Sequence, residues 1–175
     1  MAQDRPEYEV LKEFNVLANQ IIKKYPEVFY GVAIDKIRCV KITNKTRPEK
    51  RDKMWDLIPV KMPILMDCSY SYYVVLYSGD WDALPENLRL LLIAEILQGV
   101  PKDESEGKVL PPDTKGFATM FRTFKSIDYM EDAKAPHLLK DDIKWITGKD
   151  VSHDSSSTDE ENTETDSKQT ISQEA

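Results

Sequence analysis

The sequence is poor in the side chains that most often build metal and disulfide sites. Its 175 residues include two histidines, His137 and His153, and two cysteines, Cys39 and Cys68. Neither cysteine has a partner at zinc-ligand spacing, and two cysteines are too few for a disulfide scaffold. We therefore expect both cysteines to be small core side chains of a protein in a reducing compartment.

Long apolar runs and nucleophile motifs are also absent. No stretch approaches the roughly 18 apolar residues of a membrane span, and the first ten residues lack the basic start and apolar stretch of a signal peptide. No serine or cysteine lies in a Gly-x-Ser-x-Gly turn, which argues against a hydrolase with a serine or cysteine nucleophile. The sequence predicts a soluble, cytoplasmic protein that does not engage a membrane.

Excess positive charge is missing too, and the net charge of -7 is not evenly spread. Residues 150–175 contain eight acidic residues and one basic residue, whereas residues 1–149 are balanced and carry no net charge. The same 26 residues contain ten Ser or Thr and no aromatic residue. We expect one domain over residues 1–149, followed by a disordered acidic tail over 150–175.

The domain has the pattern of an α+β fold. Helical spacing over 6–29 predicts an N-terminal helix, and β-rich segments over 31–43, 55–62 and 69–77 predict a small mixed or antiparallel sheet. Residues 78–85 indicate a turn, 85–98 a helix ending at a left-handed Gly99, and 114–124 another helix. An amphipathic segment over 138–146 closes the domain, so we expect helices at its C-terminal end.

A basic loop separates the first two predicted strands. Residues 43–53 contain five basic and two acidic residues but no aromatic residue. Basic loops can contact nucleic-acid phosphates. Because aromatic residues are lacking and acidic residues intervene, a solvated hairpin connection is favoured, and a nucleic-acid partner is the weaker alternative.

The helix over 85–98 carries a carboxylate that needs an explanation. Its leucines and isoleucines surround the helix axis, which is typical of a buried helix, yet Glu95 lies among them in the same sector as Ala94 and Gln98. A buried carboxylate must find a partner or stay protonated. One interpretation is a structural bond to Arg122 or a tyrosine. The other is that Glu95 occupies the place of the Glu in His-Glu-x-x-His, where it is the general base beside a zinc ion.

The chain resembles the zincin-like phage metallopeptidase family over about residues 8–140. The similarity lies in the tyrosine-rich strand, a turn with Trp81 and Leu84, the apolar helix bearing Glu95, and a segment with Asp113 before a further helix. The opening helix with Tyr25 and Pro26 and the strand over 34–42 follow the same order. The resemblance implies a zincin-like fold, a phage or prophage origin, and a bacterial host cell as the place of action.

The departures from the family concern the metal ligands. Ala94 and Gln98 stand where the family has its two helix histidines, and Pro112 stands at the third-ligand position, so that only Glu95 and Asp113 remain of the implied site. Alanine and proline side chains offer no ligand atom, and an amide is a poor zinc donor. We expect no metal cofactor and a non-catalytic module that binds an unidentified protein partner. The alternative is an active metal-dependent peptidase with a non-standard zinc site and Glu95 as general base.

Overall fold

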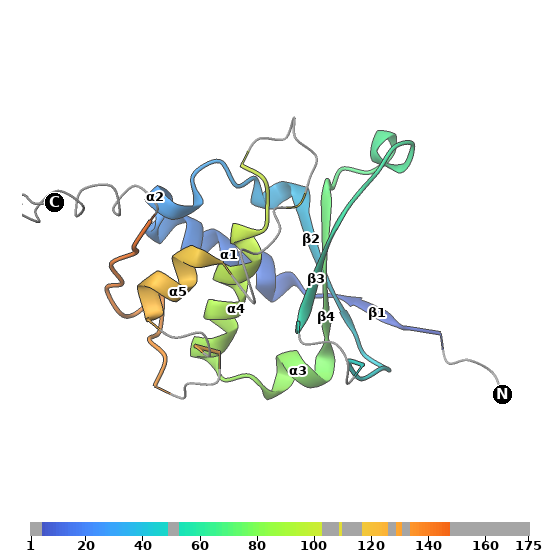
Figure 1. Ribbon diagram of the computed structural model, residues 1–175. Helices are drawn as coiled ribbons and strands as arrows, with labels where there is room; N and C mark the ends of the chain where they lie inside the picture. Colours follow the sequence, from blue (N-terminus) through green and yellow to red (C-terminus); the bar gives the residue numbers. More distant parts are fainter. Residues whose placement is uncertain are drawn as a thin grey trace, which may run out of the picture.

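A mixed four-stranded sheet lies against a layer of helices, as a computed structural model of the chain shows (Figure 1). It describes residues 5–48, 53–102, 109, 117–125, 129–130 and 134–147. The strands are β1 (Tyr8–Val10), β2 (Ile37–Ile42), β3 (Trp55–Pro59) and β4 (Tyr72–Tyr77). The α-helices of these residues are α1 (Lys12–Lys24), α2 (Pro26–Phe29), α3 (Ser78–Ala83), α4 (Glu86–Gln98) and α5 (Ala118–Phe124), and two short 3₁₀ turns are η1 (Ile34–Lys36) and η2 (Ile64–Met66). The predicted α+β class is confirmed.

The strand order is β1-β2-β4-β3, with β2 parallel to β4 and the other two pairs antiparallel. β4 thus lies between β2 and β3, and the loop that leaves β2 must reach the far edge of the sheet. The predicted hairpin between the first two strands is therefore wrong. The hairpin of this sheet joins β3 to β4 through residues 60–71.

The N-terminal segment differs from its prediction. Residues 8–10 form a strand, because their backbones pair with β2, where Tyr8 lies opposite Ile42 and Val10 opposite Val40. The helix begins only at Lys12, and Pro26 starts the separate short helix α2. β2 keeps an unbroken register against β4, so the consecutive burial of Cys39 and Val40 reflects two covered faces of a regular strand.

Two further differences flank α4. Residues 78–83 are helical where a turn was predicted, and Gly99 has a φ of -76°, which is a right-handed and not a left-handed conformation. A Cβ atom at Gly99 would meet Ile96 O and a Phe117 ring carbon, each at 3.3 Å. Close packing at the helix end therefore leaves little room for a side chain at this position, which favours glycine.

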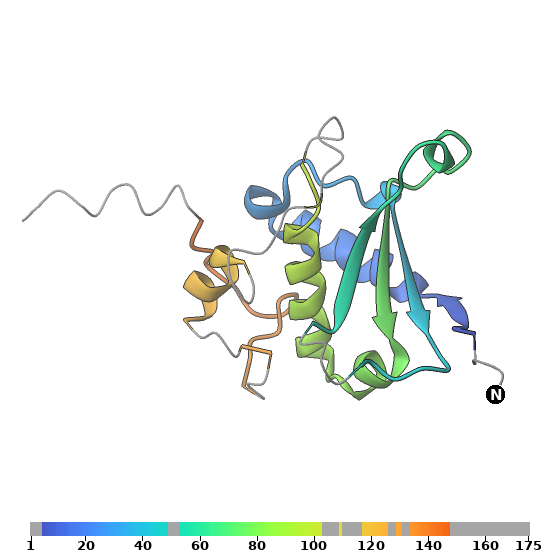
Figure 2. The ribbon, with the colours of Figure 1, turned by 45° about the vertical axis from the view of Figure 1, so that its right-hand side comes forward.

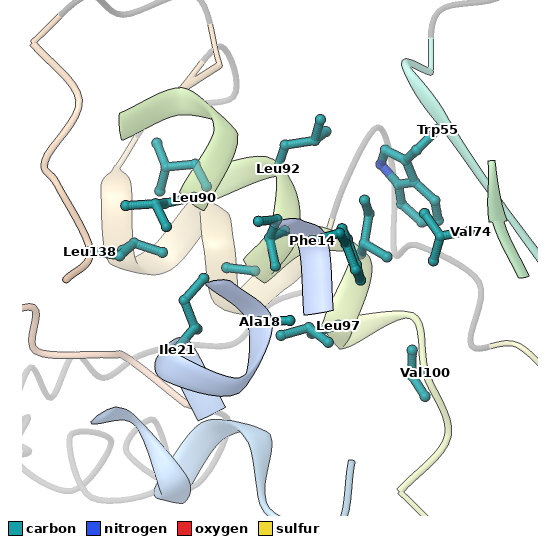
Figure 3. Close-up of a cluster of buried hydrophobic side chains, with 14 of the residues drawn as sticks. Phe14, Ala18, Ile21, Trp55, Val74, Leu90, Leu92, Leu97, Val100 and Leu138 are labelled. Carbon is teal, nitrogen blue, oxygen red and sulfur yellow. The ribbon is translucent and has the colours of Figure 1, made fainter. Parts of the chain in front are cut away.

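The core forms around α4, in which nine of the 13 residues are buried. The α1 residues Phe14, Ala18 and Ile21 are fully buried and pack with Leu90 and Leu97 of α4 in one cluster (Figure 3). Side chains of β2, β3 and β4 join this cluster from the sheet. The prediction of a buried central helix is confirmed. No helix in the described part of the chain has the length and apolarity to span a bilayer.

The segment over 138–146, predicted to be amphipathic and helical in a set of C-terminal helices, forms a turn followed by chain without regular secondary structure. Lys24 Nζ donates hydrogen bonds to the carbonyl oxygens of Leu138 (3.0 Å), Leu139 (3.2 Å) and Asp141 (2.6 Å). The Tyr25 hydroxyl donates to the Leu138 carbonyl at 2.6 Å. Side-chain donors from α1 and its end therefore hold a segment whose carbonyl groups no helix satisfies.

Replacing Lys24 with methionine tests this attachment. The change keeps an unbranched apolar stem and removes the ammonium group that binds three carbonyl oxygens, so we expect the free energy of unfolding to fall by about 1–2 kcal/mol. Lys23→Met is the matched control, because Lys23 is exposed on the same helix turn. Urea denaturation of both variants measures the difference, and equal effects would contradict the attachment.

Candidate functional site at Glu95

Glu95 is the buried charged side chain at the centre of this fold. Its side chain comes from the third turn of α4 and is 7% exposed, with fully buried neighbours Ala94 and Ile96 on either side in the chain. No other charged residue of the described ranges is buried to this degree. The sequence predicted this burial, because the residues around Glu95 in the helix are apolar.

Both carboxylate oxygens of Glu95 accept a hydrogen bond from the protein. Trp55 on β3 donates its indole Nε1–H to Oε1 at 3.2 Å, and the Tyr129 hydroxyl donates to Oε2 at 2.7 Å. Of the two structural partners expected for Glu95, the tyrosine is therefore present, whereas Arg122 on α5 is exposed. Trp55 is a partner that the sequence did not indicate.

Burial dominates the electrostatics of this group. Removal from water raises the pKa of Glu95 above its ordinary value, and the hydrogen bonds from Tyr129 and Trp55 and the positive charge of Lys53 only partly counteract the rise. Lys53 Nζ lies 4.9 Å from the centre of the Trp55 ring, the side chain whose indole N–H donates to Glu95. The positive charge that lowers the pKa of Glu95 therefore lies beside this aromatic side chain. Burial and the adjacent carboxylate likewise raise the pKa of Tyr129, which keeps its hydroxyl proton available for Glu95.

The other predicted positions contribute little polar chemistry. Ala94 is completely buried in the core. Gln98 is half-buried, and its Nε2 has no hydrogen-bond partner among the residues that the structure describes. Pro112 and Asp113 lie outside the described residues, as does the whole acidic tail over 150–175 with His153.

His137 lies near the first turn of α4, far from Glu95. Its Nε2 is 3.4 Å from Oε1 of Glu86, the first residue of α4, nine positions before Glu95. At about 1.5 Å per residue, the two ends of this separation are roughly 13 Å apart along the helix axis. His137 therefore does not join Glu95 in a ligand set.

The donor set around Glu95 does not fit a zinc ion. Zinc sites use three or four His, Cys or carboxylate ligands, and within the described ranges no three His, Cys, Asp or Glu side chains come together. Ala94 supplies no donor atom, and the groups that face Glu95 are an indole N–H and a phenol O–H, which donate protons. This arrangement can hold a carboxylate in place within the core.

A surface depression with a volume of about 340 Å³ lies away from Glu95. It is lined by Lys24, Tyr25, Glu27 and residues 142–144, and Glu95 is not part of it.

Searches of protein-family models, of curated proteins and of solved structures each found no match to this chain. The resemblance to phage metallopeptidases therefore stays a prediction.

Proposed function

We propose that this chain is a non-catalytic binding protein on a zincin-like framework, in which hydrogen bonds within the protein take the place of a metal centre. The observation that carries the proposal is the pair of bonds to Glu95, from Trp55 at 3.2 Å and from Tyr129 at 2.7 Å. These bonds involve both carboxylate oxygens of Glu95, the residue to which the family resemblance assigns the role of general base.

The required chemistry explains why these bonds matter. A general base in a metallopeptidase must reach the proton of a metal-bound water, and the metal must be held by about three protein ligands with one open position. Glu95 instead faces two proton donors, and Ala94 and Gln98 flank it where imidazoles would be needed. The same helix position thus supports the core of the fold.

A protein partner is favoured over nucleic acid. Arg47 of the basic loop has its Nε 2.9 Å from Oδ2 of Asp80, so this cation is already neutralised by the domain itself. The domain also lacks net positive charge, which removes the long-range attraction that nucleic-acid binding requires. The bacterial cytoplasm is the compartment that the family resemblance suggests.

The metal content of the purified protein tests the proposal. We expect far less than one zinc per chain by mass spectrometry after purification without chelators. One tightly bound zinc per chain would overturn it, as would peptide hydrolysis that stops on chelation and in Glu95→Gln. The hydrolysis assay distinguishes the alternative of an active peptidase with a non-standard ligand set.

A second experiment tests the zincin-like register of α4. The double variant Ala94→His/Gln98→His places two imidazoles four residues apart on one helix face, the spacing that binds zinc. Because Ala94 is fully buried, we expect a lower melting temperature without metal and a rise on adding zinc. The single variant Gln98→His is the control and should show no rise. If the double variant also shows none, the register is wrong, whereas the absence of native zinc would still stand.

A further inference from the structure

The hairpin between β3 and β4 ends in a strongly exposed apolar segment. We call residues 61–67 the apolar arm; within it Met62 is 67% exposed, Ile64 65%, Leu65 39% and Met66 73%. In Figures 1 and 2 it projects beyond the end of the sheet, away from the helices. Isolated apolar side chains on a surface are ordinary, but a contiguous group of this kind marks an interaction site.

The arm has a defined shape. Backbone hydrogen bonds join Leu65 N to Lys61 O (3.2 Å), Met66 N to Pro63 O (3.0 Å) and Asp67 N to Ile64 O (3.1 Å). Its base is fixed by the 2.8 Å bonds from Val60 N to Ser71 O and from Ser71 N to Lys36 O of the neighbouring η1 turn. The apolar side chains are therefore held outward before any partner binds, which lowers the entropy lost on association.

The two ends of the arm carry opposite charges. Lys61 and Asp67 are both exposed, and neither forms an ion pair with any residue of the described ranges. A two-fold axis through the arm would lay it antiparallel to its symmetry copy. Each Lys61 would then face Asp67 of the other copy, with the apolar side chains between the two charged pairs.

We propose that the apolar arm is a self-association surface that pairs antiparallel with the arm of a second copy of this chain. The sequence Lys-apolar-Asp is complementary to itself in that arrangement, as an interface between identical chains must be. An anionic lipid surface would attract Lys61 but repel Asp67, so it explains only one end of the arm. The inference is independent of the function proposed for Glu95.

The size of the arm sets the strength of the pair. Typical interfaces bury about 800 Å² per partner over 20–30 residues, or roughly 30–40 Å² per residue. Seven arm residues and the adjacent Ile58, which is 49% exposed, bury only a third or so of that area. We expect a weak, reversible dimer, which forms as the protein concentration rises.

Sedimentation equilibrium of the full chain at ~10–500 µM tests the proposal. The mean mass should rise toward twice that of the monomer, and Ile64→Ser should abolish the rise because it removes apolar contact at the centre of the pair. Val16→Ser is the matched control, since Val16 is an apolar residue with 58% exposure on α1. A wild-type chain that stays monomeric throughout, or an equal effect of both variants, would overturn the proposal.

Charge reversal tests the antiparallel arrangement. K61D gives the arm two negative ends and D67K gives it two positive ends, so each variant alone should self-associate about tenfold more weakly or worse. An equimolar mixture of K61D and D67K should associate at least as well as the wild type, because every facing pair is then attractive. If the mixture does not recover, or if the arm instead drives sedimentation of the monomer with vesicles containing anionic lipid, the pairing of two copies is wrong.

Discussion

Replacing Trp55 with alanine is expected to lower the free energy of unfolding by about 3–5 kcal/mol. Trp55 is 5% exposed on the edge strand β3, belongs to the main core cluster and lies opposite Leu76 of β4. Its truncation leaves a cavity between the sheet and α4, and it also removes the donor to Oε1 of Glu95. Urea denaturation followed by far-ultraviolet circular dichroism measures the loss.

The variant Trp55→Phe separates the two contributions. It keeps most of the aromatic volume and removes the indole N–H, so we expect a smaller loss of about 1–2 kcal/mol at neutral pH. The double variant Trp55→Phe/Glu95→Gln completes a mutant cycle, in which a coupling energy near zero would show that the bond to Glu95 does not stabilise the fold. If Trp55→Phe is as damaging as Trp55→Ala, the shape of the indole decides the stability at this position.

The parts of the fold that sequence reasoning predicted well are those that local pattern decides. Apolar residues of the segment 86–98 lie on every side of the helix axis, a pattern that is typical of a buried helix. The segment over 8–10 shows the opposite case. Its three residues continue a helical spacing in the sequence, but their backbone groups pair with β2, a contact that forms only when the tertiary structure does.

The sheet order illustrates a second limit. Strands that follow one another in sequence usually pair, and the predicted hairpin between β2 and β3 agrees with that tendency. β4 pairs with both of them instead, in parallel with β2 over six residues and antiparallel with β3 over five. The connection over residues 43–54 carries no local signal that would distinguish these arrangements.

The site at Glu95 combines both situations. Burial of the carboxylate, and its need for a partner, followed from the composition of α4 alone. Which groups meet it did not, because Trp55 lies 40 positions before Glu95 and Tyr129 lies 34 positions after it. Arg122 was an equally reasonable partner by charge, but its position on α5 leaves it exposed to solvent, where a guanidinium group needs no partner.

The stability of the wild-type chain should contain a component that falls as the pH rises, and Glu95 is its source. Burial raises the pKa of Glu95 in the folded protein above the ordinary value of about 4.5. Between these two values the folded state holds a proton that the unfolded state has released. The contribution of Glu95 to the free energy of unfolding is therefore most favourable below pH ~4.5, decreases as the pH rises toward the folded pKa, and is constant above it.

The variant Glu95→Gln isolates this component, because other carboxylates change the stability in the same pH range. An amide cannot ionise, and it can still accept a hydrogen bond from Trp55 and donate one to the Tyr129 oxygen. The unfolding free energy of Glu95→Gln minus that of the wild type should therefore increase with pH, by at most about 1.4 kcal/mol per pH unit. Denaturation at pH 4, 5, 6, 7 and 8 measures the difference, with exposed Glu27→Gln as the control.

The direction in which this difference changes with pH shows whether the ionised form of Glu95 destabilises or stabilises the fold. If the difference rises with pH, desolvation of the carboxylate outweighs its two hydrogen bonds and the charge of Lys53, and the fold carries an ionised group at a cost. If the difference falls with pH, the bonds from Trp55 and Tyr129 favour the ionised form more than burial opposes it. The pKa of Glu95 would then lie below its ordinary value, and the carboxylate would be an anionic anchor that stabilises the junction of β3, α4 and Tyr129.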